Sequence, residues 1–173
     1  MSNKILVAYA SRAGSTAGVA EVIGKTLADH GAQVDVHRME DIKDLTPYTA
    51  VVAGSAIQNH QWLPEATQFM QTHRLALSQK PMAAFLVCMT LSMKNNKYRE
   101  FVAGWLEPVR ALVKPVAEGL FAGALDISKI PSFSTRLKFR VSVLLGVWSE
   151  GDHRDWNAIR DWAAGIYPML QPL

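Results

Sequence analysis

A short loop near the amino terminus, Ser11 to Thr16, carries the residue types that hold a phosphate group. Three of its side chains, those of Ser11, Ser15 and Thr16, are hydroxyls that can donate hydrogen bonds to an anion. Gly14 lets the backbone approach a ligand closely, and a helix that begins here adds free N–H groups. The spacing is neither that of a Gly-x-Gly-x-x-Gly dinucleotide motif nor that of a P-loop. A hydroxyl-rich helix cap without a ligand is the alternative interpretation.

Two further loops follow apolar runs in the middle of the chain. One extends from the end of the run 50–55 to Pro64, and the other extends from the end of the run 82–90 to Met93. In an open parallel sheet, ligands bind beyond the carboxyl ends of the strands, so we expect all three loops to meet at one edge. The candidate ligand-binding residues of these two loops are Ser55, Ala56, Ile57, Gln58, Asn59, Trp62, Thr90, Leu91 and Ser92.

Two residues of the middle loop have more than one interpretation. The ring of Trp62 can stack against a bound ligand, or it can anchor the helix that follows. His60 can donate a proton, or it can be a solvated loop residue, which is the commoner case. No side chain stands out as a catalytic acid or base, and none is assigned that role.

Five apolar runs predict the strands that position these loops. The first, third and fourth are nearly continuous in apolar residues, as expected for strands buried on both faces. The second alternates between apolar and polar residues, which is typical of a half-exposed edge strand. The predicted strands are Ile5–Ala10, Val34–Met39, Ala50–Ser55, Met82–Thr90 and Gly119–Leu125.

Amphipathic segments between the strands predict four helices. Gly31 is placed to end the first helix, Pro108 to kink or divide the third, and Asp152 to cap the last. Strands that alternate with helices favour a parallel sheet covered on both sides. The predicted helices are Gly14–His30, Leu63–Ala76, Tyr98–Val113 and Asp155–Leu170.

Composition narrows the class of protein. The 173 residues are 49% apolar and 19% charged, which predicts one globular domain over residues 1–173. Five scattered histidines and a single cysteine, Cys88, predict neither a metal site nor an internal disulfide, and Cys88 is expected in the core. A net charge of +3 gives no indication of a nucleic-acid partner. The single cysteine and the lack of a signal-peptide pattern predict a cytoplasmic protein.

The segment 126–151 does not fit the alternation of strands and helices. Residues 130–148 are predicted to form a helix beside the ligand cleft, with surplus apolar surface and the basic residues Arg136, Lys138 and Arg140. Such a surface suits a membrane contact, a homodimer contact or a lid over a quinone. A helix packed on its own domain is the alternative. The predicted apolar face consists of Phe133, Leu137, Val141, Leu144, Leu145 and Trp148.

The loop 11–16, together with Gly54-Ser55-Ala56-Ile57 and Trp62-Leu63-Pro64, resembles the flavodoxin family over nearly the whole chain. The resemblance implies a three-layer α/β sandwich with five parallel strands in the order 2-1-3-4-5. It also implies one FMN, with its phosphate in the first loop and its ring between the other two. The chain departs from the family pattern at Ala13, a hydroxyl position, and at Gln58, often aromatic. The implied phosphate-binding residues are Ser11, Arg12, Ala13, Gly14, Ser15 and Thr16.

Three features resemble the menaquinone-dependent protoporphyrinogen oxidases: Arg12, the strand end Gly123-Ala124-Leu125, and the helix opening Asp155-Trp156. This resemblance implies an FMN-dependent oxidoreductase that passes electrons from a hydrophobic substrate to a quinone or another acceptor. A peripheral contact with the inner face of the cell membrane, through 130–148, fits that activity. The alternatives are an electron-transfer flavodoxin that docks to redox partners and a module that has lost its flavin. Shuttle flavodoxins are usually acidic and lack the extra segment, which favours the enzyme.

Overall fold

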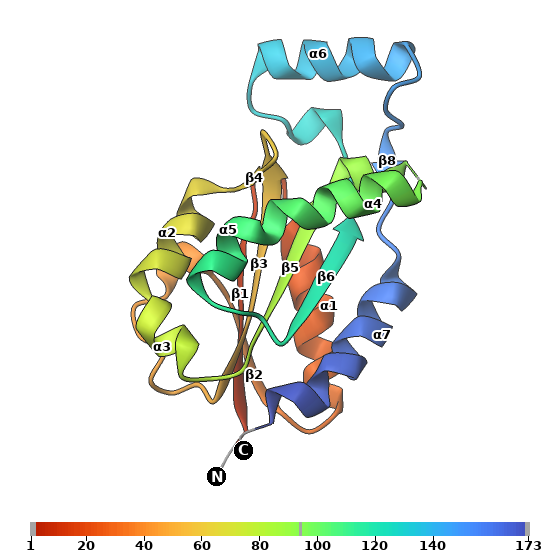
Figure 1. The fold of residues 1–173 in the computed structure, drawn as a ribbon. Helices are drawn as coiled ribbons and strands as arrows, with labels where there is room; N and C mark the ends of the chain where they lie inside the picture. Colours follow the sequence, from red (N-terminus) through yellow and green to blue (C-terminus); the bar gives the residue numbers. More distant parts are fainter. Residues whose placement is uncertain (1–2, 94, 172–173) are drawn as a thin grey trace.

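The computed structural model describes residues 3–93 and 95–171, in which strands and helices alternate (Figure 1). Parallel strands form a sheet in the order β2-β1-β3-β5-β6, which confirms the predicted order 2-1-3-4-5. β2 is an edge strand, as its alternating pattern predicts, and a short β4 pairs with β3 in the antiparallel direction. The strands are β1 (Lys4–Ala10), β2 (Gln33–Arg38), β3 (Ala50–Gln58), β4 (Gln61–Trp62), β5 (Met82–Cys88) and β6 (Ala117–Ala122).

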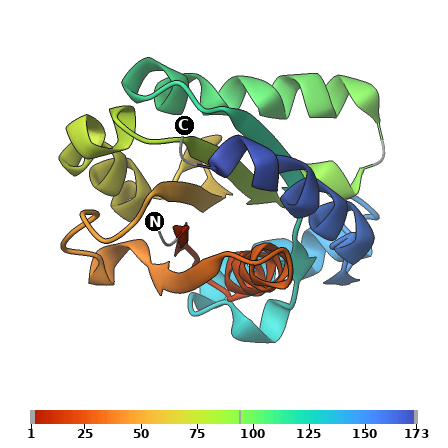
Figure 2. The same cartoon turned by 90° about the horizontal axis from the view of Figure 1, so that it is seen from below.

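Helices cover both faces of the sheet and create three layers (Figure 2). In β1, Leu6 and Ala8 pack into one core while Ile5 and Val7 pack into the other, and all four are fully buried. A strand that buries both faces needs apolar residues at successive positions, which explains the continuous run. Each buried Leu or Ile stabilises the fold by about 1.5–3 kcal/mol. One face carries α1 (Ser15–Asp29) and α7 (Trp156–Ile166), and the other carries α2 (Pro64–Thr72), α3 (Arg74–Ser78), α4 (Asn96–Ala103) and α5 (Glu107–Leu112).

The helices differ from the prediction mainly where they break. The segment 63–76 forms two helices, α2 and α3, and the segment 98–113 is divided by a 3₁₀ turn, η3 (Gly104–Leu106). Pro108 lies in the first turn of α5, where its missing N–H leaves no helical bond unmade. The first helix ends just before the predicted stop, because Gly31 adopts a left-handed φ of 102°.

The cap of the last helix was assigned to the wrong aspartate. Asp155 caps α7, since its Oδ1 accepts a hydrogen bond from the backbone N–H three residues later at 2.9 Å. Asp152 cannot take this role because it lies in the short strand β8 (Gly151–Asp152) and pairs with Arg154. After α7 the chain continues in a 3₁₀ turn, η5 (Tyr167–Leu170).

The last two predicted strands also have different ends. β5 stops at Cys88, two residues early, because the chain enters a 3₁₀ turn, η2 (Met89–Ser92). β6 begins at Ala117 and stops before Gly123, where the chain leaves the sheet. The following strand, β7 (Ala124–Leu125), pairs with β8 rather than continuing β6. The predicted strand Gly119–Leu125 therefore combined parts of two strands.

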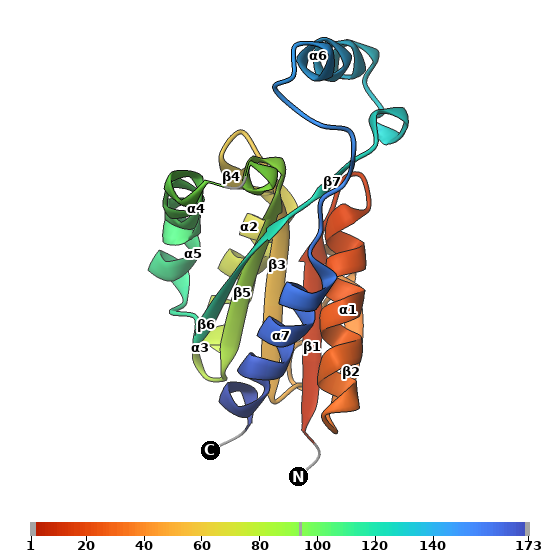
Figure 3. The same cartoon turned by 90° about the vertical axis from the view of Figure 1, so that its right-hand side faces the viewer.

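The pair β7 and β8 is a stem that carries the extra segment away from the sandwich. A 3₁₀ turn, η4 (Ile127–Lys129), leads to α6 (Phe133–Leu144), which lies beyond the carboxyl ends of the strands (Figures 1 and 3). No residue of α6 is buried. The predicted helix is present with narrower bounds, and it does not pack into the core of its own domain. Among the described residues, no helix is both long and apolar enough to cross a membrane.

Candidate functional site

Three loops leave the same edge of the sheet, where its parallel strands end. In the sheet register, Ala10 of β1 lies opposite Ser55 of β3, and Ala56 lies opposite Val87 of β5. Neighbouring strands are about 5 Å apart, so the loops that continue from these residues are neighbours in space. The topology thus brings together segments that are far apart in the sequence.

Gly123 shows how closely these segments approach one another. It lies between β6 and β7, and a methyl group added to it would lie 3.5 Å from Ser15 Oγ and 3.8 Å from Met89 Sδ. Ser15 begins α1, after the first loop, and Met89 begins the loop after β5. The end of β6 therefore borders the same region as the three loops.

The first loop leads into the amino-terminal end of α1, which has the features of an anion-binding helix end. Ser11 Oγ accepts a hydrogen bond from Gly14 N at 3.1 Å, which closes the loop. Gly14 precedes α1 with a φ of 90°, a conformation that glycine adopts without steric cost. No side chain among the described residues caps α1, and its first turn holds no acidic residue. The first N–H groups of α1 therefore remain available to a ligand.

Thr16 has an unsatisfied hydroxyl inside this helix end. The residue is fully buried, and its Oγ1 has no hydrogen-bond partner among the residues that the structure describes. Leaving such a group unpaired costs about 1–3 kcal/mol. Further along α1, Thr26 Oγ1 donates to the carbonyl oxygen of Val22 at 2.8 Å. Thr16 lies in the first turn and has no helical carbonyl four residues earlier, so its hydroxyl can serve an external acceptor.

Arg12 forms an ion pair within the protein, although more than half of its side chain is exposed. Its Nη1 and Nη2 donate to the two carboxylate oxygens of Glu65 at 2.7 and 3.0 Å. Glu65 lies in the first turn of α2, so this pair connects the first loop to that helix. Ala13 and Gly14 are exposed at the tip of the loop. The hydroxyls and backbone N–H groups of the loop, rather than the arginine charge, are therefore the candidate donors to an anion.

The middle loop is a tight hairpin between β3 and β4. β3 extends past the predicted Ser55 to Gln58, and Asn59 and His60 form the turn. Both turn residues have positive φ values, 51° and 63°, as a type I′ turn requires. Gln58 and Asn59 are exposed, whereas Ala56 and Ile57 before them are half-buried. The hairpin thus presents a polar tip at the edge of the sheet.

Ser55 fixes the base of this hairpin. Its hydroxyl donates to the carbonyl oxygen of Ala56 at 2.7 Å and accepts from Leu63 N at 3.0 Å. The side chain is fully buried, and both bonds stay within the loop. Ser55 therefore positions the hairpin, and only its backbone remains to contact a ligand.

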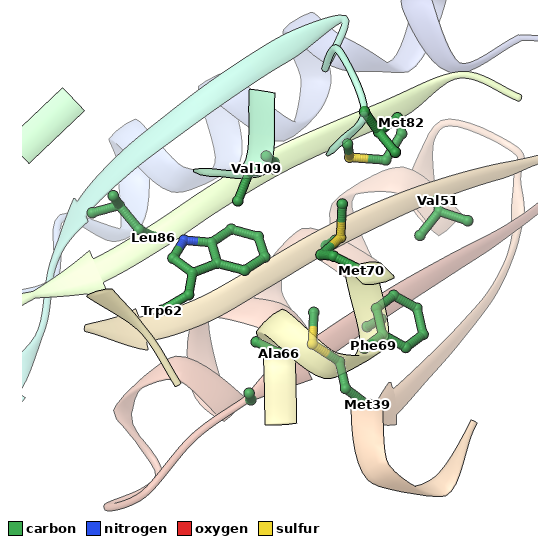
Figure 4. Close-up of a cluster of buried hydrophobic side chains, with 14 of the residues drawn as sticks. Met39, Val51, Trp62, Ala66, Phe69, Met70, Met82, Leu86 and Val109 are labelled. Carbon is green, nitrogen blue, oxygen red and sulfur yellow. The ribbon is translucent and has the colours of Figure 1, made fainter. Parts of the chain in front are cut away.

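Trp62 and His60 hold the hairpin by packing. Trp62 is 6% exposed and lies in the core beside Leu86 and Met70 (Figure 4), which fits the interpretation that it anchors the following helix. His60 stacks on Trp105 at a ring distance of 5.0 Å, and Phe101 meets it edge-on at 5.9 Å. Both rings thus have protein partners that the sequence alone did not reveal.

The third loop is the 3₁₀ turn η2. Ser92 Oγ donates to the carbonyl oxygen of Met89 at 2.7 Å, which holds the turn, and Thr90 and Leu91 are half-buried beside it. Cys88 precedes the turn and is buried, as predicted for a core residue. Burial raises the pKa of its thiol to about 11, so the thiol stays protonated near neutral pH and is a poor nucleophile.

Arg154 is a residue of this region that no sequence pattern indicated. It follows β8, 139 residues beyond Ser15, yet its Nη1 donates to the carbonyl oxygen of Ser15 at 3.2 Å. Asp152 accepts two hydrogen bonds of 2.8 Å from the guanidinium, which also lies 4.4 Å from the ring centre of Trp156. No motif or spacing links these residues, because the fold alone brings them together.

A cavity of about 120 Å³ opens beside the first loop. Arg154 and Lys129 contribute cations to its wall, but each is paired with a carboxylate, Asp152 and Asp126 respectively. Their charges are therefore partly offset. The wall residues are Ala13, Gly14, Ser15, Ala124, Asp126, Lys129 and Arg154.

A larger cavity, of about 200 Å³, lies under the hairpin between α2 and α5. Its apolar wall includes Trp62, Met70 and Leu112, and it shares no residue with the first loop. It belongs to the packing that supports the hairpin rather than to the candidate anion site at the first loop. No group of three or more His, Cys, Asp or Glu residues within the described part of the chain could hold a metal ion.

A family model for the flavodoxin domain matches residues 6–144. The chain belongs to the flavodoxin-domain family. Proteins of this family bind flavin and transfer electrons. A search of curated proteins found no match to the chain.

Solved structures show the same fold. A flavodoxin from the domain Archaea is 19% identical, with 96% of this chain and 98% of that chain covered and a TM-score of 0.56. The two-electron-reduced flavodoxin of Megasphaera elsdenii is 13% identical, with coverage of 93% and 98% and a TM-score of 0.57. Oxidised flavodoxin 2 from Bacillus cereus is 25% identical, with coverage of 83% and 99% and a TM-score of 0.54.

Proposed function

We propose that this protein binds FMN at the carboxyl edge of its sheet and transfers electrons through the flavin. The observation that carries the proposal is the buried, unpaired Oγ1 of Thr16 at the uncapped end of α1. A phosphate oxygen would satisfy that hydroxyl and the free N–H groups of the first turn together.

The residues around Thr16 would have different roles in binding FMN. Gly14 leaves the phosphate approach open, because a methyl group on it would meet no atom within 4 Å, and Ser11 and Ser15 add hydroxyl donors. The hairpin 56–62 and the turn 89–92 would border the flavin ring with backbone groups and half-buried side chains. FMN supplies the hydride and one-electron chemistry when bound, and the protein supplies position and hydrogen bonds.

Substitution of Thr16 tests this proposal through two effects, one on FMN affinity and one on the stability of the protein without FMN. Thr16→Val should lower FMN affinity by about 1–3 kcal/mol, the contribution of a hydrogen bond to a charged group. In the protein without FMN, the same change removes an unpaired buried hydroxyl, so the free energy of unfolding should stay the same or rise. Flavin titration by fluorescence and urea unfolding of the apoprotein measure the two effects.

Two variants serve as controls for this experiment. Thr16→Ser keeps a hydroxyl and should retain most of the FMN affinity. Thr26→Val changes the same residue type in the same helix, but its hydroxyl already has a partner, so FMN affinity should not change. Equal FMN affinity in wild type and Thr16→Val would show that the phosphate binds elsewhere.

Within this class, we propose an oxidoreductase that passes electrons from a hydrophobic substrate to a quinone or another acceptor, as in the menaquinone-dependent protoporphyrinogen oxidases. Support comes from α6, an exposed helix with an apolar face at the end of the molecule where the three loops lie. A peripheral position at the inner face of the cell membrane would bring such a flavoprotein to a lipid-soluble acceptor.

An electron-transfer flavodoxin is the second candidate, supported by the similarity to flavodoxin structures over nearly their full length. Steady-state turnover with protoporphyrinogen and a menaquinone analogue distinguishes the two. The oxidoreductase should consume both at a rate that depends on bound FMN. A shuttle should show no such turnover and should instead exchange electrons with a reductase.

A further inference from the structure

Helix α6 exposes a continuous apolar face to solvent. Phe133, Leu137, Val141 and Leu144 recur at steps of four, four and three residues, so they share one side of the helix. Their exposed fractions are 74%, 53%, 47% and 85%. The half-buried residues of α6 that face the other way include Phe139 and Val143. The outward face therefore lacks a partner in the described part of the chain.

Basic residues border this apolar face. At 100° per residue, Arg136 and Arg140 fall along one side of it and Lys138 along the other. None of these three forms an ion pair with a carboxylate of the described residues. A small hollow of about 80 Å³ lies between the two arginines, Phe133 and Leu137. Cationic and apolar groups thus meet at one place on the surface.

The sequence around α6 contains no opposing charge. From Ile127 to Ser149 the chain has four basic residues and no Asp or Glu. We propose that α6 docks this protein on the surface of a bilayer that contains anionic phospholipid. The apolar face would enter the region between headgroups and acyl chains, while Lys and Arg side chains extend outward to the phosphates. This inference extends the proposed function but does not depend on FMN, because none of the residues proposed to bind FMN belongs to α6.

Charge also argues against a second copy of the chain as the occupant of this face. A symmetric dimer places the same patch on both sides of its interface. Two α6 helices would then bring their cations together, with no carboxylate in either helix to pair with them. An anionic bilayer satisfies the same cations and also accepts the apolar side chains.

Docking through α6 would turn the flavin edge of the sheet toward the bilayer. The helix lies beyond the carboxyl ends of the strands, on the stem formed by β7 and β8 (Figure 3). Arg154 joins that stem to the first loop through its bonds to Asp152 and Ser15. A lipid-soluble electron acceptor would therefore reach the loops without leaving the bilayer surface.

Vesicle sedimentation of the full chain tests the proposal. The protein should sediment with vesicles of equal parts phosphatidylcholine and phosphatidylglycerol, and much less with phosphatidylcholine alone. Added salt should weaken the binding, because it screens the cations from the lipid phosphates. Replacing Arg136, Lys138 and Arg140 by Gln should weaken it about fivefold for each charge removed.

The apolar contribution needs its own variant and a matched control. Phe133→Ser, Leu137→Ser and Leu144→Ser together should lower vesicle binding by at least about tenfold. The control triple Leu75→Ser, Val116→Ser and Met169→Ser changes exposed apolar residues outside α6 and should bind like wild type. Lys43→Gln, Lys114→Gln and Arg160→Gln are the corresponding charge control, on exposed cations outside α6 that form no ion pair with a carboxylate of the described residues.

Three results would overturn the proposal. Absence of wild-type binding to the mixed vesicles would remove the lipid partner. Equal losses in the α6 variants and in their controls would show that α6 has no special role. A dimer in light scattering that the α6 serine triple dissociates would identify a second copy as the occupant, since wild type is expected to be monomeric.

Discussion

The first loop and helix α6 lie at the same end of the molecule, but they are held in place in opposite ways. The loop is tied to the core by Thr16, which is fully buried, and it is closed by the hydrogen bond between its own residues Ser11 and Gly14. α6 has no buried residue and is joined to the body by a two-strand stem. The positions of the loop residues are therefore fixed by the core, whereas the residues of α6 form an exposed surface that is free to contact a partner.

The largest loss of stability is expected at Gly54, where the sheet is tightly packed. A methyl group at Gly54 of β3 would overlap the ring of Phe85, which is fully buried against Phe121 and Trp162. Gly54→Ala should therefore destabilise the protein by about 3 kcal/mol. Urea unfolding measures this, and Phe85→Leu in the same chain should restore part of the loss. A cost below about 1 kcal/mol would show that the core can shift.

Arg154 tests the link between the two regions. Arg154→Ala removes the bond to the carbonyl oxygen of Ser15 and the pair with Asp152, so stability should fall by about 1 kcal/mol and FMN affinity should weaken. Arg154→Lys keeps the charge but loses the two-pronged geometry, and it should recover less than half of the loss. Urea unfolding and flavin titration measure these effects. Unchanged values in Arg154→Ala would mean that the stem is attached by other contacts.

A loss of stability of intermediate size is expected in the edge strand β2. A hydrogen bond from Lys4, with a second from Tyr48, lowers the pKa of Asp35 below its ordinary value. Its carboxylate therefore stabilises the fold above about pH 4, and this contribution is lost as pH falls through the lowered pKa. Asp35→Asn should cost about 0.5 kcal/mol near neutral pH, since the pair is one-third exposed. At about pH 3 the difference in unfolding free energy should shrink, and a constant difference would contradict this assignment.

The smallest effect on stability is expected in α6. The triple change Phe133→Ser, Leu137→Ser and Leu144→Ser alters only exposed side chains, so the free energy of unfolding should change by less than about 0.5 kcal/mol. Thermal unfolding followed by circular dichroism measures this. A large loss of stability would place these side chains in a core and remove the contrast between the two regions.

Sequence patterns that depend on neighbouring residues predicted the structure best. Continuous apolar runs predicted the buried strands because both faces of β1, β3 and β5 are covered. The place of the loop 11–16 between a strand and a helix was predicted in the same way, and β1 and α1 flank it in the structure. Pro108 was predicted to kink or divide a helix, although the break itself lies at 104–106. The prediction that Asp152 caps the last helix was wrong. Asp152 and Asp155 are only three residues apart, and only the path of β8 decides which of them precedes the helix.

The sequence by itself determined the α/β class, the strand order through family resemblance, and the loop that is proposed to hold a phosphate. Only the tertiary structure decided that the side chains of Ser55 and Arg12 bond to other residues of the protein, that Trp62 packs in the core, and that Arg154 reaches Ser15. It also decided that the apolar face of α6 has no partner in its own body. The physical reason is that periodicity reports which side of an element is apolar, whereas partners across the chain depend on how the elements are packed.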